Sequence, residues 1–210
     1  MEKRIDRPEM ITWIIAAGNI LTWILNMVTG GGSVRGLLLS GGGYVKAFGE
    51  ASFSSVMIQG EWWRLLTCGY LHMGVFHLFF NLCALFLVGN RVEKYLGHFR
   101  FFLLYHIGTV ITALVWCFLF RNGSMVGASL GIFVSLGIYA FFARSDRKKE
   151  VLRINRGQRN YLILYVLIGC LLGVGTIMVH FIGFVVGMVY GWLCTGQKFG
   201  HWANQSQNAP

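Results

Sequence analysis

Charged residues are scarce in this sequence. Only 12% of its 210 residues are Asp, Glu, Lys or Arg, and 55% are apolar, whereas soluble domains carry about 25% charged residues. The mean hydropathy is +0.59, and the stretch from Tyr161 to Cys194 contains no charged residue at all. This pattern excludes an ordinary soluble domain and predicts an integral membrane protein.

Acidic residues are rarer still, and none of the eight lies well inside an apolar run. The sequence therefore lacks the paired membrane aspartates of an aspartyl intramembrane protease and the carboxylate relay of a proton-coupled transporter. It also lacks a HExxH zinc motif and any CxxC pair, and its cysteines lie inside or at the edge of apolar runs. We therefore expect no disulfide framework, no metal site and no cofactor.

The net charge of +10 raises the question of a nucleic-acid partner. The Lys and Arg residues form short clusters between apolar runs and do not build one basic domain. Such clusters suit anionic lipid headgroups better than nucleic acid. We expect the lipid bilayer, and no nucleic acid, among the partners.

The apolar runs predict an all-α, polytopic membrane protein with six spans. As one helix, the run from Tyr161 to Cys194 would be about 50 Å long against about 30 Å of hydrocarbon, so we expect two helices with a break at Gly173-Val174-Gly175-Thr176. A cleaved signal peptide is the less favoured interpretation of the first run, because no small-residue cleavage site follows it. The other expected spans are Met10–Val28, Val75–Gly89, Phe99–Phe120 and Gly127–Ala143.

Basic residues are distributed unevenly between the two sides of this arrangement. One side holds 14, and the other holds four, namely Arg35, Lys46, Arg64 and Arg121. The positive-inside rule then places both termini in the cytoplasm, in a protein of the cell membrane. We expect a cytoplasmic segment at 1–9, a membrane domain at 10–196 and a cytoplasmic tail at 197–210. A Gly-rich loop at about 29–74 would lie on the outer surface, with Trp62 and Trp63 as interfacial anchors.

A small set of polar residues falls inside the expected spans. His77 and Asn81 stand one helical turn apart at the start of the second span, Ser129 opens the fourth, and His180 opens the sixth. These three spans all run from outside to inside, so the four residues share one depth below the outer surface. An imidazole near a serine can activate it as a nucleophile. The backbone N–H of Ser129 and the side chains of His77 and Asn81 could donate to an oxyanion.

Packing residues favour the same pairing of helices. His180, Gly183, Gly187 and Gly191 lie on one narrow face, where small residues let another helix approach. Phe133 follows Ser129 by one turn, and its ring could stack on His180. Plainer interpretations exist, since a membrane Ser often bonds to its own helix and a His or a Gly stripe often serves packing alone. The shared depth favours a joint, functional interpretation.

Taken in order, these residues resemble the motifs of the rhomboid family of intramembrane serine proteases, over roughly Gly60 to Trp192. The resemblance implies a six-helix fold. It also implies an enzyme that hydrolyses peptide bonds of transmembrane protein substrates near the outer face of the membrane. It implies Ser129 as nucleophile, His180 as base, and His77 and Asn81 in the oxyanion hole. Supporting positions would be Gly127, Phe133, Gly183, Gly187, Arg64 and Glu93. The matching segments are Gly60–Thr67 (Trp-Arg motif), His72 with His77–Asn81 (HxxxN), Gly89–Gly97 (GxxxExxxG), Gly127–Ser129 (start of GxSG) and His180–Gly183.

Two positions depart from the family pattern. Leu130 stands where the motif has its final Gly, and Phe133 stands in the position of a Tyr. We expect Leu130 to crowd the oxyanion hole or to alter substrate choice. The chief alternative is a catalytically silent rhomboid-like protein that binds membrane partners. A small channel or transporter is a third class, which the missing intramembrane charges disfavour.

Overall fold

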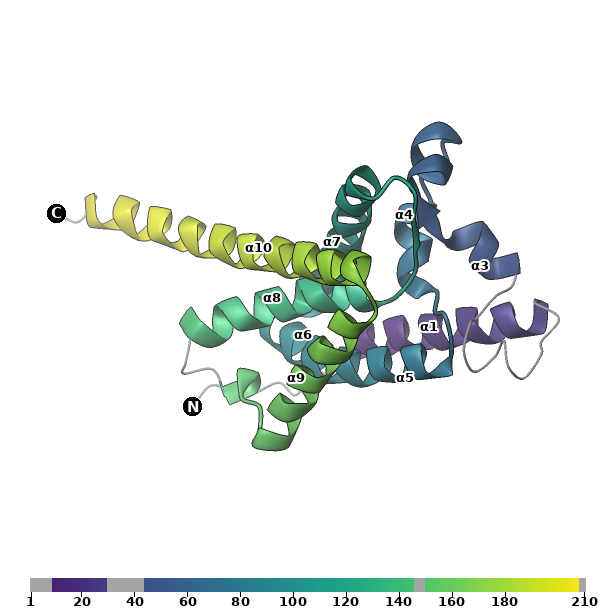
Figure 1. Cartoon of the computed structure of the whole chain (residues 1–210). Coiled ribbons are helices and arrows are strands. Elements are labelled where there is room, and N and C mark those ends of the chain that lie inside the picture. The colour runs from purple at the N-terminus through teal and green to yellow at the C-terminus, as the bar shows by residue number, and fades with distance from the viewer. Residues whose placement is uncertain (1–8, 30–43, 146–149, 208–210) are drawn as a thin grey trace.

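The computed structural model describes residues 9–29, 44–145 and 150–207. Within these residues, six long helical segments lie where the apolar runs predict them (Figure 1). Helix α5 continues without interruption through a π-helical turn, η3, into α6. The segments are α1 (Met10–Thr29), α5 (Val75–Ala84) with η3 (Leu85–Gly89) and α6 (Asn90–Leu96), α7 (His98–Leu119), α8 (Ser129–Ser145), α9 (Arg156–Leu171) and α10 (Val174–Gln207).

Four of these segments are long and apolar enough to cross a membrane: α1, Val75–Leu96, α7 and the Val174–Cys194 part of α10. Helices α8 and α9 are shorter, with 17 and 16 residues. The apolar part of α9 begins only at Tyr161. The prediction of an all-α, multi-pass membrane protein is confirmed, and four of the six expected spans meet the length and composition of a membrane crossing.

The second span was predicted too short, because its charged residues look like a loop in the sequence. The helix continues past Gly89 to Leu96, where Gly97 ends it with φ +87°. Glu93, which is buried, faces the start of α1 and accepts hydrogen bonds from the backbone N–H groups of Ile11 and Thr12, both at 2.8 Å. The carboxylate thus satisfies donors that a helix N-terminus leaves unpaired.

The break in the last apolar run is narrower than predicted. It consists of Leu172 and Gly173, so Val174 already begins α10. Gly173 has φ +109°, a conformation that L side chains rarely adopt. Helix α10 also continues to Gln207, so the described part of the segment expected as a tail is helical.

The loop expected at about 29–74 holds short elements that the sequence did not indicate. Strand β1 (Ala51–Ser52) pairs antiparallel with β2 (Ser124–Met125), which lies in the connection between α7 and α8. Residues 30–43 of the expected loop lie outside the described residues, and Trp62 and Trp63 are exposed. The remaining elements of the loop are α3 (Tyr44–Gly49), η1 (Ser54–Ile58), α4 (Arg64–Thr67) and η2 (Cys68–Tyr70).

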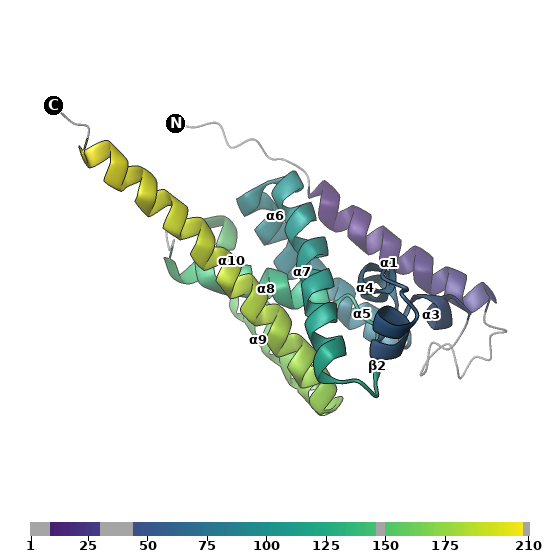
Figure 2. The ribbon, with the colours of Figure 1, turned by 90° about the horizontal axis from the view of Figure 1, so that it is seen from above.

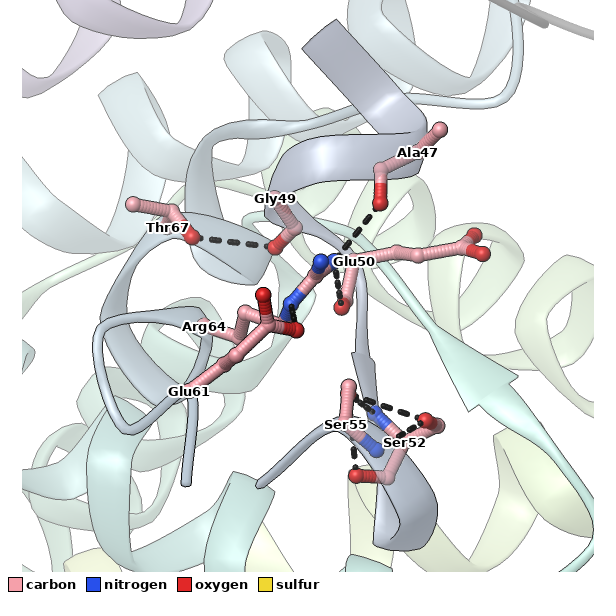
Figure 3. Close-up of polar contacts among 8 residues, drawn as sticks. All are labelled: Ala47, Gly49, Glu50, Ser52, Ser55, Glu61, Arg64 and Thr67. Atoms are coloured by element: carbon pink, nitrogen blue, oxygen red, sulfur yellow. Dashed lines mark hydrogen bonds and ion pairs between the residues drawn. The ribbon is translucent and has the colours of Figure 1, made fainter. Parts of the chain in front are cut away.

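Arg64 ties this loop together, as Figure 3 shows. Its side chain is buried and its Nε donates to Glu61 at 2.7 Å. Its Nη1 donates to the carbonyl oxygens of Ala47 and Glu50, at 2.6 and 3.0 Å. One guanidinium therefore connects α3 to α4 and to the residue that precedes β1, using the several donors that only Arg provides.

Helices α8 and α10 run side by side in both views of the molecule (Figures 1 and 2). A β-carbon on Gly187 of α10 would lie 2.0 Å from the carbonyl oxygen of Val134, and one on Gly137 of α8 would lie 2.1 Å from that of Phe184. Only glycine permits so close an approach of two helix backbones. The expected contact along the Gly face is confirmed, and it joins the helices that carry Ser129 and His180.

Candidate active site

Ser129 is the first residue of α8, and the segment before it is held by backbone hydrogen bonds. Met125 pairs with Ala51 across the two strands, and the N–H of Gly127 donates to the carbonyl of Cys68 at 2.9 Å. Gly127 has φ +141°. A β-carbon at this position would lie 3.0 Å from Cε1 of His77 and 3.3 Å from Oγ of Ser129. Gly127 thus leaves room for the serine hydroxyl and the imidazole on either side of it.

The imidazole of His180 is held by packing. Its ring stacks on that of Phe133, with the centroids 4.0 Å apart and an interplanar angle of 8°. On another side lies Gly169 of α9, where a β-carbon would come within 2.5 Å of the ring. The expected stack is confirmed. Within the described residues, Nδ1 of His180 has no hydrogen-bond partner.

His77 presents one particular nitrogen to this region. Its Nδ1 accepts from the backbone N–H of Met73 at 3.4 Å, a long bond. In a neutral ring the other nitrogen, Nε2, then carries the proton. A β-carbon on Gly127 would lie 3.2 Å from this Nε2. The His77 donor is thereby directed toward the space beside Ser129.

Asn81 is buried one turn after His77, and both ends of its amide are bonded. Nδ2 donates to the carbonyl of His77 at 2.8 Å, and Oδ1 accepts from the hydroxyl of Tyr165 at 2.7 Å. An amide nitrogen carries two hydrogens. The second N–H of Asn81 is therefore available for another acceptor.

One small cavity of about 50 Å³ brings the four predicted residues together from three helices. Its walls are mainly apolar otherwise. We call it the inner cavity. In the described part of the chain, no hydrogen bond joins Ser129 to His180, although both line this cavity. Catalytic hydrogen bonds often tighten only when substrate is bound. The lining is His77, Phe80, Asn81, Ser129, Tyr165, Ile168, Gly169, Leu172, Thr176 and His180.

A second cavity, of about 280 Å³, also borders Ser129. We call it the outer cavity. It shares His77, Ser129, Leu172 and Thr176 with the inner one, and β2 contributes both of its residues to the wall. Lys46 of α3 and Glu50, which follows that helix, also line it, so its wall carries both signs of charge. Sequence reasoning did not find this cavity.

The remaining predicted residues occupy supporting places. Leu130 is 1% exposed and packs with Cys68, Met125 and Val179. It lines the outer cavity but not the inner one, so this placement does not support the expectation that it crowds the oxyanion hole. Gly183 lets α10 approach the carbonyl of Leu130, since a β-carbon there would lie 3.0 Å from that oxygen.

Arg64 and Glu93 line neither cavity. Arg64 holds the loop that contains α3 and α4, and Glu93 binds the start of α1, so neither residue belongs to the candidate site. Tyr165 does line the inner cavity and was missed. The available signal was its spacing of one turn from Tyr161 inside an apolar helix, but tyrosines are common near the ends of membrane helices, so this pattern is weak.

The sequence is similar to known proteins of one family. The model of the Rhomboid domain matches residues 59–197, which is more than half of the chain. Rhomboid protease GluP of Bacillus subtilis (strain 168) is 40% identical over 137 residues, which are 65% of this chain and 25% of GluP. Putative rhomboid protease YdcA of the same organism is 32% identical over 147 residues, 67% of this chain and 71% of YdcA.

RHOMBOID-like protein 4 of Arabidopsis thaliana is 30% identical over 178 residues, 79% of this chain and 42% of that protein. The chain thus spans well under two thirds of GluP and of this plant relative. The match to the family domain extends from before α4 into α10 and includes all the residues gathered at the inner cavity. The chain therefore belongs to the rhomboid family.

Proposed function

We propose that this protein is an intramembrane serine endopeptidase that hydrolyses peptide bonds of transmembrane proteins near the outer face of the membrane. The observation that carries the proposal is the inner cavity, where Ser129, His180, His77 and Asn81 converge from α8, α10 and α5. Polar groups at membrane depth are costly and are kept for function. The relatives named rhomboid proteases support the same reaction class.

Ser129 would act as the nucleophile and His180 as the general base. The imidazole takes the proton of Oγ as this oxygen attacks the substrate carbonyl, and it later returns a proton to the leaving amine. Water then hydrolyses the acyl-enzyme in the same way. The stack on Phe133 would orient the ring of His180, a task that a carboxylate performs in a Ser-His-Asp triad.

Three donors would stabilise the oxyanion that forms in each step. They are Nε2–H of His77, the second N–H of Asn81 and the backbone N–H of Ser129 at the start of α8. Donors that are already oriented toward the developing charge lower the barrier most. The start of a helix also carries a partial positive charge.

The scissile bond would lie at Ser129, next to the inner cavity. The outer cavity also reaches Ser129, so it would receive substrate residues that flank this bond. The orientation proposed from the basic residues, with both termini in the cytoplasm of a cell-membrane protein, places this cavity toward the outside. The segments 1–9, 10–196 and 197–210 would then be the cytoplasmic start, the membrane domain and the cytoplasmic tail.

The test is labelling with a fluorophosphonate probe in detergent, together with cleavage of a model transmembrane substrate. We expect the probe to label Ser129, and we expect Ser129→Ala and His180→Ala to abolish labelling and cleavage without loss of folding. Ser135→Ala is the matched control, because Ser135 is also on α8 and bonds to the carbonyl of Gly131. Wild-type cleavage by either dyad variant would refute the dyad. A folded wild type that neither labels nor cleaves would favour the silent, partner-binding alternative.

A further inference from the structure

Tyr165 is a buried tyrosine of α9 whose hydroxyl reaches across to α5. It is 7% exposed and donates to Oδ1 of Asn81 at 2.7 Å. On its other side the Asn81 amide donates to the carbonyl of His77. A carbonyl can only accept, and Tyr165 donates to the amide oxygen, so the two contacts together permit one orientation of the amide. The unused N–H of Asn81 is fixed as a result.

The ring of Tyr165 has a second contact. It stacks on Phe133 with the centroids 5.6 Å apart and an interplanar angle of 25°. Phe133 in turn stacks on His180. One side chain therefore contacts Asn81 directly and contacts the residue that supports the imidazole.

Tyr161, one turn earlier on the same helix, provides a comparison. Its hydroxyl also donates to α5 at 2.7 Å, but to the backbone carbonyl of Phe80. It lines neither cavity. Both hydroxyls donate to an acceptor away from water, and buried polar groups generally need such a hydrogen bond. Only the bond from Tyr165 acts on a side chain that can rotate.

We propose that Tyr165 is a positioning residue that sets the Asn81 amide for the oxyanion. The expected effect on kcat rests on the proposed function, whereas the contact between Tyr165 and Asn81 does not depend on it. Without the hydroxyl, the amide keeps only its bond to the His77 carbonyl, and its buried Oδ1 loses its partner, so the side chain is free to rotate about that remaining bond. Its N–H would then be directed at the oxyanion for only part of the time.

The kinetic test compares the hydroxyl deletions Tyr165→Phe and Tyr161→Phe with loss of the amide itself in Asn81→Ala. Asn81→Ala removes a donor and should lower kcat by about 10² to 10³, the usual effect of losing one oxyanion donor. Tyr165→Phe keeps the donor but frees it, so we expect a smaller loss of kcat, about tenfold, with KM within about twofold of wild type. Tyr161→Phe should leave both constants within about twofold, since its partner is backbone.

The decisive comparison is in the Asn81→Ala background. There Tyr165→Phe should have no further effect on kcat, because the amide that it positions is gone. An undiminished loss in this background, or a wild-type kcat for Tyr165→Phe itself, would refute the inference.

A second measurement does not depend on activity. In protein labelled with ¹⁵N asparagine, the side-chain amide signal of Asn81 is identified by its loss in Asn81→Ala. Tyr165→Phe should shift or broaden that signal, and Tyr161→Phe should leave it in place. If the signal moves while the wild type shows no peptidase activity, the positioning holds and the proposed function fails. If the signal does not move, the positioning is wrong whatever the activity.

Discussion

Leu130 departs from the family motif, and its burial changes the effect expected of replacing it. The side chain belongs to the same buried cluster as Cys68, Met125 and Val179, and it does not line the inner cavity. We expect Leu130→Gly to lower the free energy of unfolding by about 2 to 5 kcal/mol, as truncation of a buried leucine does, and not to accelerate cleavage. Thermal unfolding in detergent measures the first effect and substrate cleavage the second.

Leu119→Gly is the control for this change, because Leu119 ends α7 and is 58% exposed. It should cost no more than about 1 kcal/mol, the helix penalty of glycine. A faster Leu130→Gly enzyme would show that the leucine does restrict the oxyanion hole.

His72 predicts a dependence of stability on pH. It lies before α5, is 2% exposed, and neither ring nitrogen is bonded within the described residues. Burial lowers the pKa of His72 well below its ordinary value, and the neighbouring His77 lowers it further. The folded state then stays neutral at a pH where the unfolded state takes up a proton. Stability should therefore fall as the pH drops below about 6.5, the ordinary histidine value.

His72→Phe removes this titration and keeps an aromatic ring in the site. The difference in melting temperature between pH 7.5 and pH 5.5 should be smaller in this variant than in the wild type. Equal differences in the two proteins would mean that His72 is not kept neutral by the fold.

At the level of the helices, the contact between α8 and α10 determines how Ser129 and His180 face each other. Gly187→Ala would place a methyl group 2.0 Å from the carbonyl oxygen of Val134. The two helices must separate to admit it. We expect a loss of about 1 to 3 kcal/mol, typical of overpacking, and at least a tenfold slower cleavage.

Gly157→Ala offers a matched comparison on α9, because a β-carbon there meets only Asn155, at 3.4 Å. Its stability and cleavage should remain close to wild type. Unchanged cleavage in Gly187→Ala would mean that the spacing of these helices does not control the site.

The helices could be predicted from the sequence because apolar runs are local and strong signals. The ends of the helices were harder to predict from the sequence. The extension to Leu96 depends on Glu93, whose partners Ile11 and Thr12 lie some eighty residues away. The pairing of β1 with β2 involves two residues per strand, too few for any period to appear.

Within the candidate site, the sequence predicted the four polar residues that line the inner cavity. It did not predict Tyr165, whose partner Asn81 is 84 positions away. A tyrosine in an apolar helix gives no indication of which face it occupies. The outer cavity was missed for a related reason, since its wall combines α3, β2 and the start of α10, and no local pattern relates these segments.

For the whole molecule, the proposed orientation can be tested with one pair of asparagines. Asn122 follows α7 on the side proposed to be outside, and Asn160 lies in the first turns of α9 on the side proposed to be inside. Both are exposed. In a background without the five native cysteines, Asn122→Cys should react with an impermeant thiol reagent on intact cells and Asn160→Cys should not.

Opening the cells before labelling should make both positions reactive, which controls for burial. The reverse pattern on intact cells would overturn the orientation. It would also move the site to the cytoplasmic face.

The shortness of α9 has a consequence for the surrounding lipid. Its apolar part runs from Tyr161 to Leu171, about 16 Å at the rise of an α-helix, against about 30 Å of hydrocarbon. Acyl chains beside this helix must shorten or tilt, and each ångström of such hydrophobic mismatch costs a fraction of a kcal/mol. Helix α9 therefore favours a thin bilayer on its own side of the protein, whereas α1 and α7 match one of ordinary thickness. We expect the bilayer to be thinner beside α9 than beside α1 and α7, and we expect the protein to favour thinner membrane regions.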